Sequence, residues 1–283
     1  MTVGRVENGV VTGRLSRPVL AHEQEEAVLD QVFAAIAELF DEEIRGVGCG
    51  VPSVVDVATG VLHDVENIPA WHRVPLKDRL ERRFGVPVEI NNDANVFALG
   101  EHFYGRGRDF ENLVGLTLGT GMGTGVIANG RLFAGNNCGV GEIGSIPHKG
   151  LTIEDYCSGR FFRREAGMSG EAVFERATSG DAAAREWFDR FGEELAFAVV
   201  VALYAYDPDA ILFGGSISTA FDLFAASMWQ GLDVFDYPHI LERLVIERST
   251  LADAAVLGAA ALVSVSFRDE AGDAEDHPSG RTK

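Results

Sequence analysis

The chain has 283 residues, of which 46% are hydrophobic, enough to bury a sizeable core in one large domain or in two lobes. It carries 43 Asp and Glu against 24 Lys and Arg, a formal net charge of −19. This acidic balance argues against nucleic acids and membrane surfaces as partners, because both are bound through concentrated Lys and Arg.

Cysteine usage favours a reducing compartment. The cysteines Cys49, Cys138 and Cys157 are odd in number and contain no C-x-x-C pair, so we expect no disulfide framework. No basic-then-apolar segment opens the chain, and no apolar run is of membrane-spanning length. We therefore expect a soluble, cytoplasmic protein.

The first hundred residues predict strands alternating with helices. In chain order we expect a hairpin over 2–15, a helix over 25–40, a strand over 46–51, a helix over 76–84, a strand over 86–90 and a helix over 94–103. Asn8-Gly9 is the hairpin signal, and apolar residues at helical spacing mark the helix of 25–40. Such an alternation is typical of α/β architecture.

The rest of the chain continues this pattern up to an abrupt change of composition. We expect strands over 113–118 and 125–128, a helix over 181–206, a strand over 210–213 and an Ala-rich helix over 252–267. From residue 268 to residue 283 the sequence is rich in Asp, Glu, Gly, Ser and Pro, which predicts a disordered acidic tail.

Asp93 stands at the end of a predicted strand, within Asn91-Asn92-Asp93-Ala94-Asn95. An Asp before a helix is a favoured N-cap, and this interpretation stays open. The neighbouring amides favour a ligand site, because open α/β sheets bind ligands at the carboxyl ends of their strands. There a carboxylate can accept the proton of a hydroxyl that attacks phosphorus.

A glycine-rich turn follows at residues 118–125, where Gly119, Gly121 and Gly123 alternate with other residues. A dinucleotide-binding turn should open a helix, and a Walker loop needs Gly-Lys-Ser/Thr, so neither interpretation fits. What remains is a hairpin whose N–H groups and Thr120 and Thr124 hydroxyls hold phosphate. The alternative is a hairpin that is merely tight.

Two glutamates follow the glycine turn. Glu142 is enclosed between glycines in 139–144, and Glu154 comes twelve residues later. A lone Glu is usually surface charge. Glycine neighbours beside apolar residues instead suit a carboxylate that binds sugar hydroxyls.

From about residue 2 to residue 263 the chain resembles the ROK family of sugar kinases and related repressors. The matching segments occur in the family's order and at suitable spacing: Gly50-Val51-Pro52, 66–71, 91–95, 116–125, 139–144, 211–215 and 257–260. The resemblance implies an actin-like, hexokinase-type (ribonuclease H-like) α/β fold of two lobes with a cleft between them. We expect the lobes over 1–97 and 98–267.

The resemblance also implies ATP and Mg²⁺ as cosubstrates, a sugar as substrate and a homodimer as the assembly. Asp93 would be the catalytic base. Sugar hydroxyls would be contacted by Asn92, Glu142 and Glu154, helped by the loop that holds Gly50 and Pro52. The remaining site residues would bind the nucleotide, its phosphates at Gly119, Thr120, Gly121, Gly123 and Thr124 and its adenosine at Gly214 and Gly215.

The chain departs from the family at a metal site. Many members carry Gly-His and then a Cys-x-Cys-Gly-x-x-Gly-Cys zinc motif, where this chain has Gly144-Ser145 and a short, cysteine-free segment over 146–153. Structural zinc takes four N or S ligands, and the nearby Cys138, His148 and Cys157 do not make a usual set. We expect no zinc, two buried thiols and a surface His. The missing histidine contacts the sugar in relatives, which leaves the choice of sugar open.

The second departure is at the N-terminus. Family kinases begin with a strand and an Asp-x-Gly-Gly-Thr turn that meets ATP phosphates, whereas this chain opens on what resembles the second strand. Either the start is internal to a longer reading frame or the chain is truncated; the coherence of the other motifs favours the first. The leading prediction is an ATP-dependent hexose kinase, and the alternative is a catalytically impaired sugar-binding or sensing protein. A purely structural protein is disfavoured by the Asn and Glu clusters.

Overall fold

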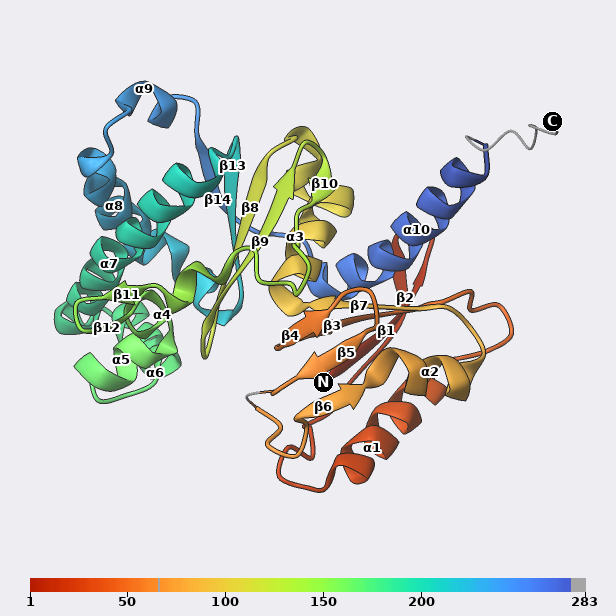
Figure 1. Ribbon diagram of the computed structural model, residues 1–283. Helices are drawn as coiled ribbons and strands as arrows, with labels where there is room; N and C mark the ends of the chain where they lie inside the picture. The colour runs from red at the N-terminus through yellow and green to blue at the C-terminus, as the bar shows by residue number, and fades with distance from the viewer. Residues whose placement is uncertain (66, 276–283) are drawn as a thin grey trace. The chain divides into compact units, whose positions relative to one another are not determined.

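A computed structural model describes residues 1–65 and 67–275 of the chain (Figure 1). The chain divides into two compact units. Unit 1 contains residues 1–100, the short segment 136–138 and the residues from Asp253 onward. Unit 2 contains residues 101–135 and 139–252. Glu66, from one of the family-like segments, and residues 276–283 of the expected tail lie outside the described residues.

Unit 1 is a mixed α/β unit, as its sequence predicts. Its elements are β1 (Thr2–Glu7), β2 (Val10–Ser16), α1 (Glu25–Ala37), β3 (Val47–Val51), β4 (Val54–Asp56), β5 (Val61–His63), β6 (Arg73–Pro75), α2 (Leu76–Phe84), β7 (Val88–Asn92), the start of α3 (Asp93–Tyr104) and α10 (Ala254–Glu275). β1 and β2 form an antiparallel hairpin, β3 and β7 a parallel pair, and β4, β5 and β6 an antiparallel sheet. Asn8 and Gly9 connect β1 to β2 with positive φ angles of 51° and 78°, the conformation that Asn-Gly favours.

The final helix belongs to a different unit from the one that the sequence predicted. We expected residues up to 267 in the second lobe, but α10 belongs to unit 1. A Cβ atom added to Gly48 of β3 would lie 1.7 Å from the Ala259 carbonyl oxygen, and one added to Gly258 would lie 1.6 Å from the Val96 carbonyl oxygen. Glycine at both positions therefore lets α10 approach β3 and α3 at backbone distance.

The predicted disorder from residue 268 is wrong for its first part, because α10 continues to Glu275. Residues 268–275 include Arg, Ala and Glu, which favour helix, and they extend a helix that has already formed.

Unit 2 is built on a five-stranded sheet. The strand order is β10-β9-β8-β13-β14, with β8 (Leu113–Leu118) antiparallel to β9 (Met122–Ala128) and parallel to β13 (Ala210–Gly214). β10 (Arg131–Leu132) and β14 (Val245–Arg248) form its edges. The helices are α4 (Ile153–Tyr156), α5 (Gly159–Glu165), α6 (Gly170–Thr178), α7 (Ala182–Tyr206), α8 (Phe221–Gly231) and α9 (Pro238–Leu241), and a short hairpin is formed by β11 (Pro147–His148) and β12 (Leu151–Thr152).

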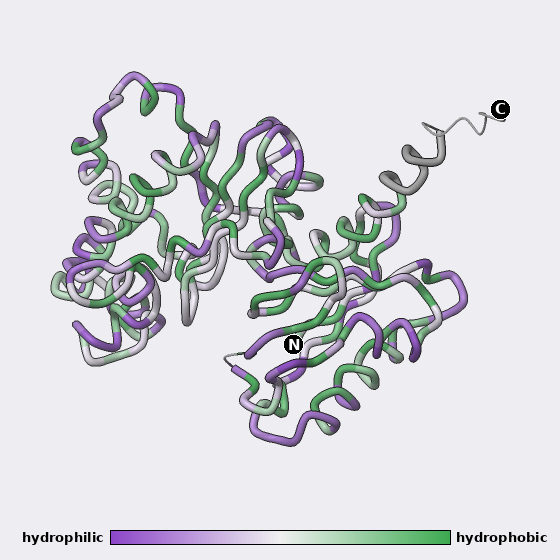
Figure 2. The backbone as a smooth tube through the Cα atoms, in the orientation of Figure 1, coloured by the Kyte–Doolittle hydropathy of each residue, from purple (hydrophilic) through white to green (hydrophobic). Residues whose placement is uncertain are grey.

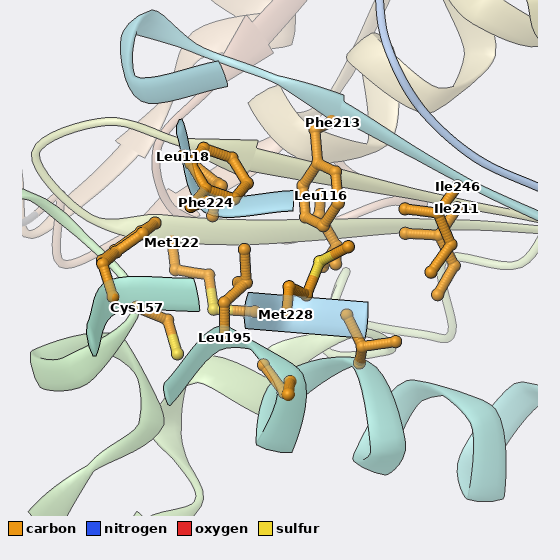
Figure 3. Packing of buried hydrophobic residues seen from close by; sticks show 14 of the residues in the cluster. Leu116, Leu118, Met122, Cys157, Leu195, Ile211, Phe213, Phe224, Met228 and Ile246 are labelled. Carbon is orange, nitrogen blue, oxygen red and sulfur yellow. The ribbon is translucent and has the colours of Figure 1, made fainter. Parts of the chain in front are cut away.

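The core of unit 2 lies between this sheet and α7 and α8. Leu116 and Phe213 from the strands pack toward Leu195 and Met228 from the helices (Figure 3). Figure 2 shows hydrophobic residues along the central strands and hydrophilic residues in many connecting loops. This packed core gives the turns at the strand ends a rigid base. In the described part of the chain, no helix is both long enough and apolar enough to cross a membrane.

Candidate active site

In unit 1, the predicted sugar loop and the predicted base lie at one end of a parallel strand pair. β3 and β7 align so that Gly50 is opposite Asn91. A Cβ atom on Gly50 would lie 3.4 Å from the Asp93 Cα atom, so the loop that contains Gly50 and Pro52 begins directly beside Asp93. The Asn92 side chain completes this group, with its Nδ2 atom 3.5 Å from the Ser53 carbonyl oxygen. The structure therefore brings together the four site residues predicted in unit 1.

The sequence left open whether Asp93 caps a helix or acts in catalysis. In the structure, Asn92 and Asp93 both cap the N-terminus of α3. α3 begins at Asp93, and the Ala94 N–H donates to Asn92 Oδ1 and to Asp93 Oδ1, at 2.9 Å in each case. Asp93 itself is exposed. The surrounding protein nevertheless partly desolvates the carboxyl and raises its pKa, against the lowering effect of the Ala94 hydrogen bond. A carboxylate of raised pKa is a stronger base than an ordinary Asp.

Asn91 organises the end of β7, a role that the sequence did not assign to it. Its Oδ1 atom accepts hydrogen bonds from Asn92 N at 2.9 Å, Asn95 Nδ2 at 2.8 Å and Cys138 Sγ at 3.1 Å. Asn91 is only 4% exposed, so these bonds replace the water that its amide loses. The run of asparagines at a strand end is a signal for Asn91, but no local signal connects it to Cys138.

In unit 2, the glycine-rich segment forms the tip of the β8–β9 hairpin. Leu118 pairs with Met122, so the turn consists of residues 119–121 and contains Gly119, Thr120 and Gly121. The predicted turn was too long, because Gly123 and Thr124 belong to β9. Thr124 is 5% exposed and its hydroxyl has no hydrogen-bond partner within the described residues. Because Thr124 lies in β9 and pairs with β8, its hydroxyl is not part of the turn that the sequence predicted to bind phosphate.

The predicted adenosine segment lies beside this turn. Gly214 of β13 is opposite Thr117 of β8, and Gly215 follows with a φ of 80°. A Cβ atom on Gly215 would lie 2.3 Å from the Leu118 carbonyl oxygen, so only glycine allows this approach. The two predicted nucleotide-binding segments are thus neighbours in the fold.

The two predicted glutamates of unit 2 have different surroundings. Glu154 Oε2 accepts a hydrogen bond from Met122 N at 2.9 Å, so this side chain lies at the glycine turn. Glu142 is exposed and opens a 3-10 helix (Glu142–Ser145). It borders an open hollow of about 280 Å³, whose other lining residues are Phe133, Gly139, Val140, Gly141, Ile143, Ile146 and Tyr206. Burial raises the pKa of the Tyr206 hydroxyl, with a further contribution from the Glu142 charge.

The residues considered for zinc are distributed over both units. Cys138 belongs to unit 1, whereas His148 and Cys157 belong to unit 2. Cys138 and Cys157 are buried, but the expected surface position of His148 is wrong: its side chain is 12% exposed. Its ring stacks on Phe197 with 4.2 Å between centroids. No cluster of three or more potential metal ligands occurs among residues 1–65 and 67–275.

Comparisons with known proteins agree with this architecture. A family model described as the ROK family matches residues 12–265. The chain is 32% identical to a glucokinase of Thermotoga maritima, over 93% of each chain. It is 31% identical to an N-acetyl-D-glucosamine kinase of Aliivibrio salmonicida, over 76% of this chain and 82% of the relative.

The solved structure of a ROK family glucokinase from Streptomyces griseus, in complex with glucose and AMPPNP, resembles the fold. It has a TM-score of 0.79 and 27% identity, and the alignment covers 92% of this chain and 94% of the other. These similarities confirm the predicted hexokinase-type, actin-like fold class.

Proposed function

Because the chain belongs to the ROK family, we propose that it transfers a phosphoryl group from ATP to a hydroxyl of a hexose or a related sugar. The observation that carries this proposal is Asp93, an exposed carboxyl of raised pKa at the end of β7. The glucokinase and N-acetyl-D-glucosamine kinase relatives support a sugar substrate, and the similar structure with glucose and AMPPNP supports ATP as donor.

In the proposed reaction Asp93 acts as the general base. It accepts the proton of the sugar hydroxyl, most simply the primary one, as that oxygen forms a bond to the γ-phosphorus of ATP. The bond between the γ-phosphorus and the bridging oxygen breaks, and ADP leaves. The raised pKa of Asp93 makes proton acceptance more favourable while the carboxyl stays accessible to the substrate.

Asn92 and Glu142 are proposed to hold the sugar. The Asn92 amide is oriented by its bond from Ala94 N, which leaves little freedom in its side chain. Glu142 is fixed on a short helix that follows Gly141, a residue with a φ of 95°. An amide held in this way positions a hydroxyl for attack with less loss of entropy on binding.

The turn of residues 119–121 is proposed to bind the phosphates through its N–H groups, and Gly214 and Gly215 to approach the adenosine. Both segments are nearly free of side chains, which allows a ligand to reach the backbone. Mg²⁺ would be held largely by the phosphates and water, and would neutralise charge that develops on the transferred group.

The direct test is a screen for ADP release with ATP and a panel of monosaccharides, including glucose, mannose and N-acetyl-D-glucosamine. We expect saturable ADP release with at least one hexose and no release without sugar. Calorimetry on the same panel separates the alternatives. Sugar binding without ATP binding would support the impaired sugar sensor, and binding of neither ligand would refute both proposals.

A further inference from the structure

Arg160 lies beside two carboxylates at the start of α4. Its Nη2 atom lies 2.8 Å from Glu154 Oε1, and its Nη1 atom lies 3.5 Å from Asp155 Oδ1. This arrangement suits the planar fork of arginine better than the compact ammonium of lysine. Asp155 is itself held in a capping box, where its Oδ2 atom accepts from the Thr152 hydroxyl at 2.7 Å. Arg160 therefore holds Glu154 in place relative to the cap of α4.

Helix stability does not account for an arginine at position 160. α5 begins at Gly159, so Arg160 occupies its first turn, where the helix dipole disfavours a positive charge. The backbone is nevertheless well fixed there, because Arg160 N donates to the Ser158 hydroxyl at 3.2 Å. The preceding Gly159 N donates to the Gly119 carbonyl oxygen at 2.8 Å. The guanidinium is thus anchored where it reaches Glu154, and this contact offsets the unfavourable effect of the dipole.

Glu154 borders two parts of the proposed active site. Its Oε2 atom accepts the Met122 N–H at 2.9 Å, next to the turn of residues 119–121. A Cβ atom on Gly144 would lie 3.5 Å from the Glu154 Cβ atom, and Gly144 belongs to the 3-10 helix that Glu142 opens. Glu154 is therefore a neighbour both of the turn proposed to bind phosphate and of the helix that carries a proposed sugar contact.

The Glu154 carboxylate keeps capacity for a ligand. An ionised carboxylate can accept about four hydrogen bonds, and the contacts from Met122 and Arg160 take up only part of this capacity. The Glu154 side chain is 23% exposed, so part of it is open to a ligand. Because a protein group already holds each oxygen, the carboxylate would accept a hydroxyl with little further loss of side-chain freedom.

We propose that Arg160 is a positioning residue for the sugar, which holds Glu154 in the orientation in which its carboxylate accepts a sugar hydroxyl. The proposal rests on the proposed kinase function and on Glu154 as a sugar contact beside Asn92 and Glu142, as the family resemblance predicts. In this assignment Arg160 acts through Glu154.

The test compares Michaelis constants for the two substrates, with glucose, mannose and N-acetyl-D-glucosamine as the sugars. Arg160→Met removes the guanidinium and keeps much of the side-chain volume. We expect the KM for the sugar to rise about 10-fold, as for the loss of a charge-assisted hydrogen bond, while kcat changes less than about threefold. The KM for ATP should stay close to that of the wild type, because the Met122 N–H still holds the other oxygen of Glu154. Arg160→Lys keeps the charge but not the fork, so it should restore part of the affinity for the sugar.

Arg164→Met is the matched control. Arg164 lies on the same helix, pairs with Glu165 at 2.9 Å and donates to the Asp155 carbonyl oxygen at 3.0 Å. It therefore also joins α5 to α4, but through the backbone of α4 and not through Glu154. We expect both Michaelis constants of this variant to equal those of the wild type.

A double variant tests whether Arg160 acts through Glu154. Glu154→Gln alone should raise the KM for the sugar, and the addition of Arg160→Met should raise it little further, because the effects of residues in contact are not additive. Effects of the two changes that simply multiply would contradict the coupling.

Two further outcomes would overturn the inference. An unchanged KM for the sugar in Arg160→Met, with only a lower melting temperature, would make the role of Arg160 structural. A higher KM for ATP alone would assign Arg160 to the nucleotide. If the wild type releases no ADP with any of these sugars, the proposed function fails, and calorimetry with the same sugars decides the inference. Weaker sugar binding by Arg160→Met than by the wild type would then support it, and equal binding, or no binding by the wild type, would overturn it.

Discussion

Asn91 accepts a hydrogen bond from Cys138, with 3.1 Å between Oδ1 and Sγ, although 47 residues separate them. Cys138 is part of the segment 136–138, which belongs to unit 1 while the residues on both sides of it belong to unit 2. The contact therefore holds the segment 136–138 at the end of β7, the strand that precedes Asp93.

Asn91→Leu is expected to destabilise the protein by about 2–4 kcal/mol. The change leaves the buried Asn95 amide and the Asn92 N–H without their acceptor, and unsatisfied buried donors are costly. Chemical denaturation measures this loss. Asn137→Ala, a change at an exposed asparagine beside Cys138, is the control and should cost less than about 0.5 kcal/mol. Equal stability of both variants would contradict the role of Asn91.

Asp93→Asn is expected to lower kcat about 100-fold or more, since the amide cannot accept the hydroxyl proton. Sugar and ATP should still bind, because Asn keeps the side-chain oxygen that accepts the Ala94 N–H. Steady-state kinetics and calorimetry on the same sample check both points. Asp78→Asn, on the surface of α2, is the matched control and should retain full turnover. Full turnover by Asp93→Asn would exclude it as the base.

The raised pKa of Asp93 predicts opposite effects of pH on activity and stability. Activity needs the ionised carboxylate, so kcat/KM should fall as the pH drops through the pKa of Asp93, at a higher pH than for an ordinary Asp. Folding favours the protonated form of Asp93, because desolvation disfavours the charged carboxylate. The stability that results is fully present below the pKa of Asp93 in the unfolded chain, and it is lost as the pH rises through the pKa of Asp93 in the folded protein.

It follows that Asp93→Asn should unfold at a higher urea concentration than the wild type at pH 7, and that this difference should shrink as the pH approaches about 4. Urea titrations across this range measure the effect. If Asp93→Asn were less stable than the wild type at neutral pH, favourable interactions would stabilise the ionised Asp93 more than desolvation destabilises it, and this prediction would be wrong.

The β11–β12 hairpin is expected to depend on Glu194 for its attachment to α7. Lys149 Nζ contacts both Glu194 oxygens, at 2.7 and 2.8 Å, and His148 Nε2 lies 3.3 Å from Glu194 Oε2. Glu194→Gln should destabilise the protein by about 1 kcal/mol, because Lys149 is largely exposed and solvent screens its charge. Hydrogen exchange at residues 147–152 should also become faster.

Glu186→Gln, at an exposed position of the same helix, is the control for this attachment. We also expect a metal chelator to leave the melting temperature of the wild type unchanged, since we propose that these ion pairs attach the hairpin without zinc. A drop of several degrees with the chelator would reveal a bound metal and refute this prediction.

The sequence by itself determined the features that depend on local signals. Alternating strand and helix patterns predicted the α/β class, Asn8-Gly9 predicted a hairpin, and the strand end at Asp93 marked the candidate base. Each rests on the periodicity or conformational preference of neighbouring residues, which holds before the chain folds.

Only the tertiary structure decided how distant segments pair. The register of β8 and β9 places Thr124 in β9 and not in the turn, and the tertiary packing places Glu154 in contact with Met122. Glycines in β3 and α10 allow the last helix to pack closely within unit 1, whereas the order of the sequence predicted it in the second lobe. These positions depend on close contacts between segments far apart in the chain, and the pattern of residues around each one does not encode its partner.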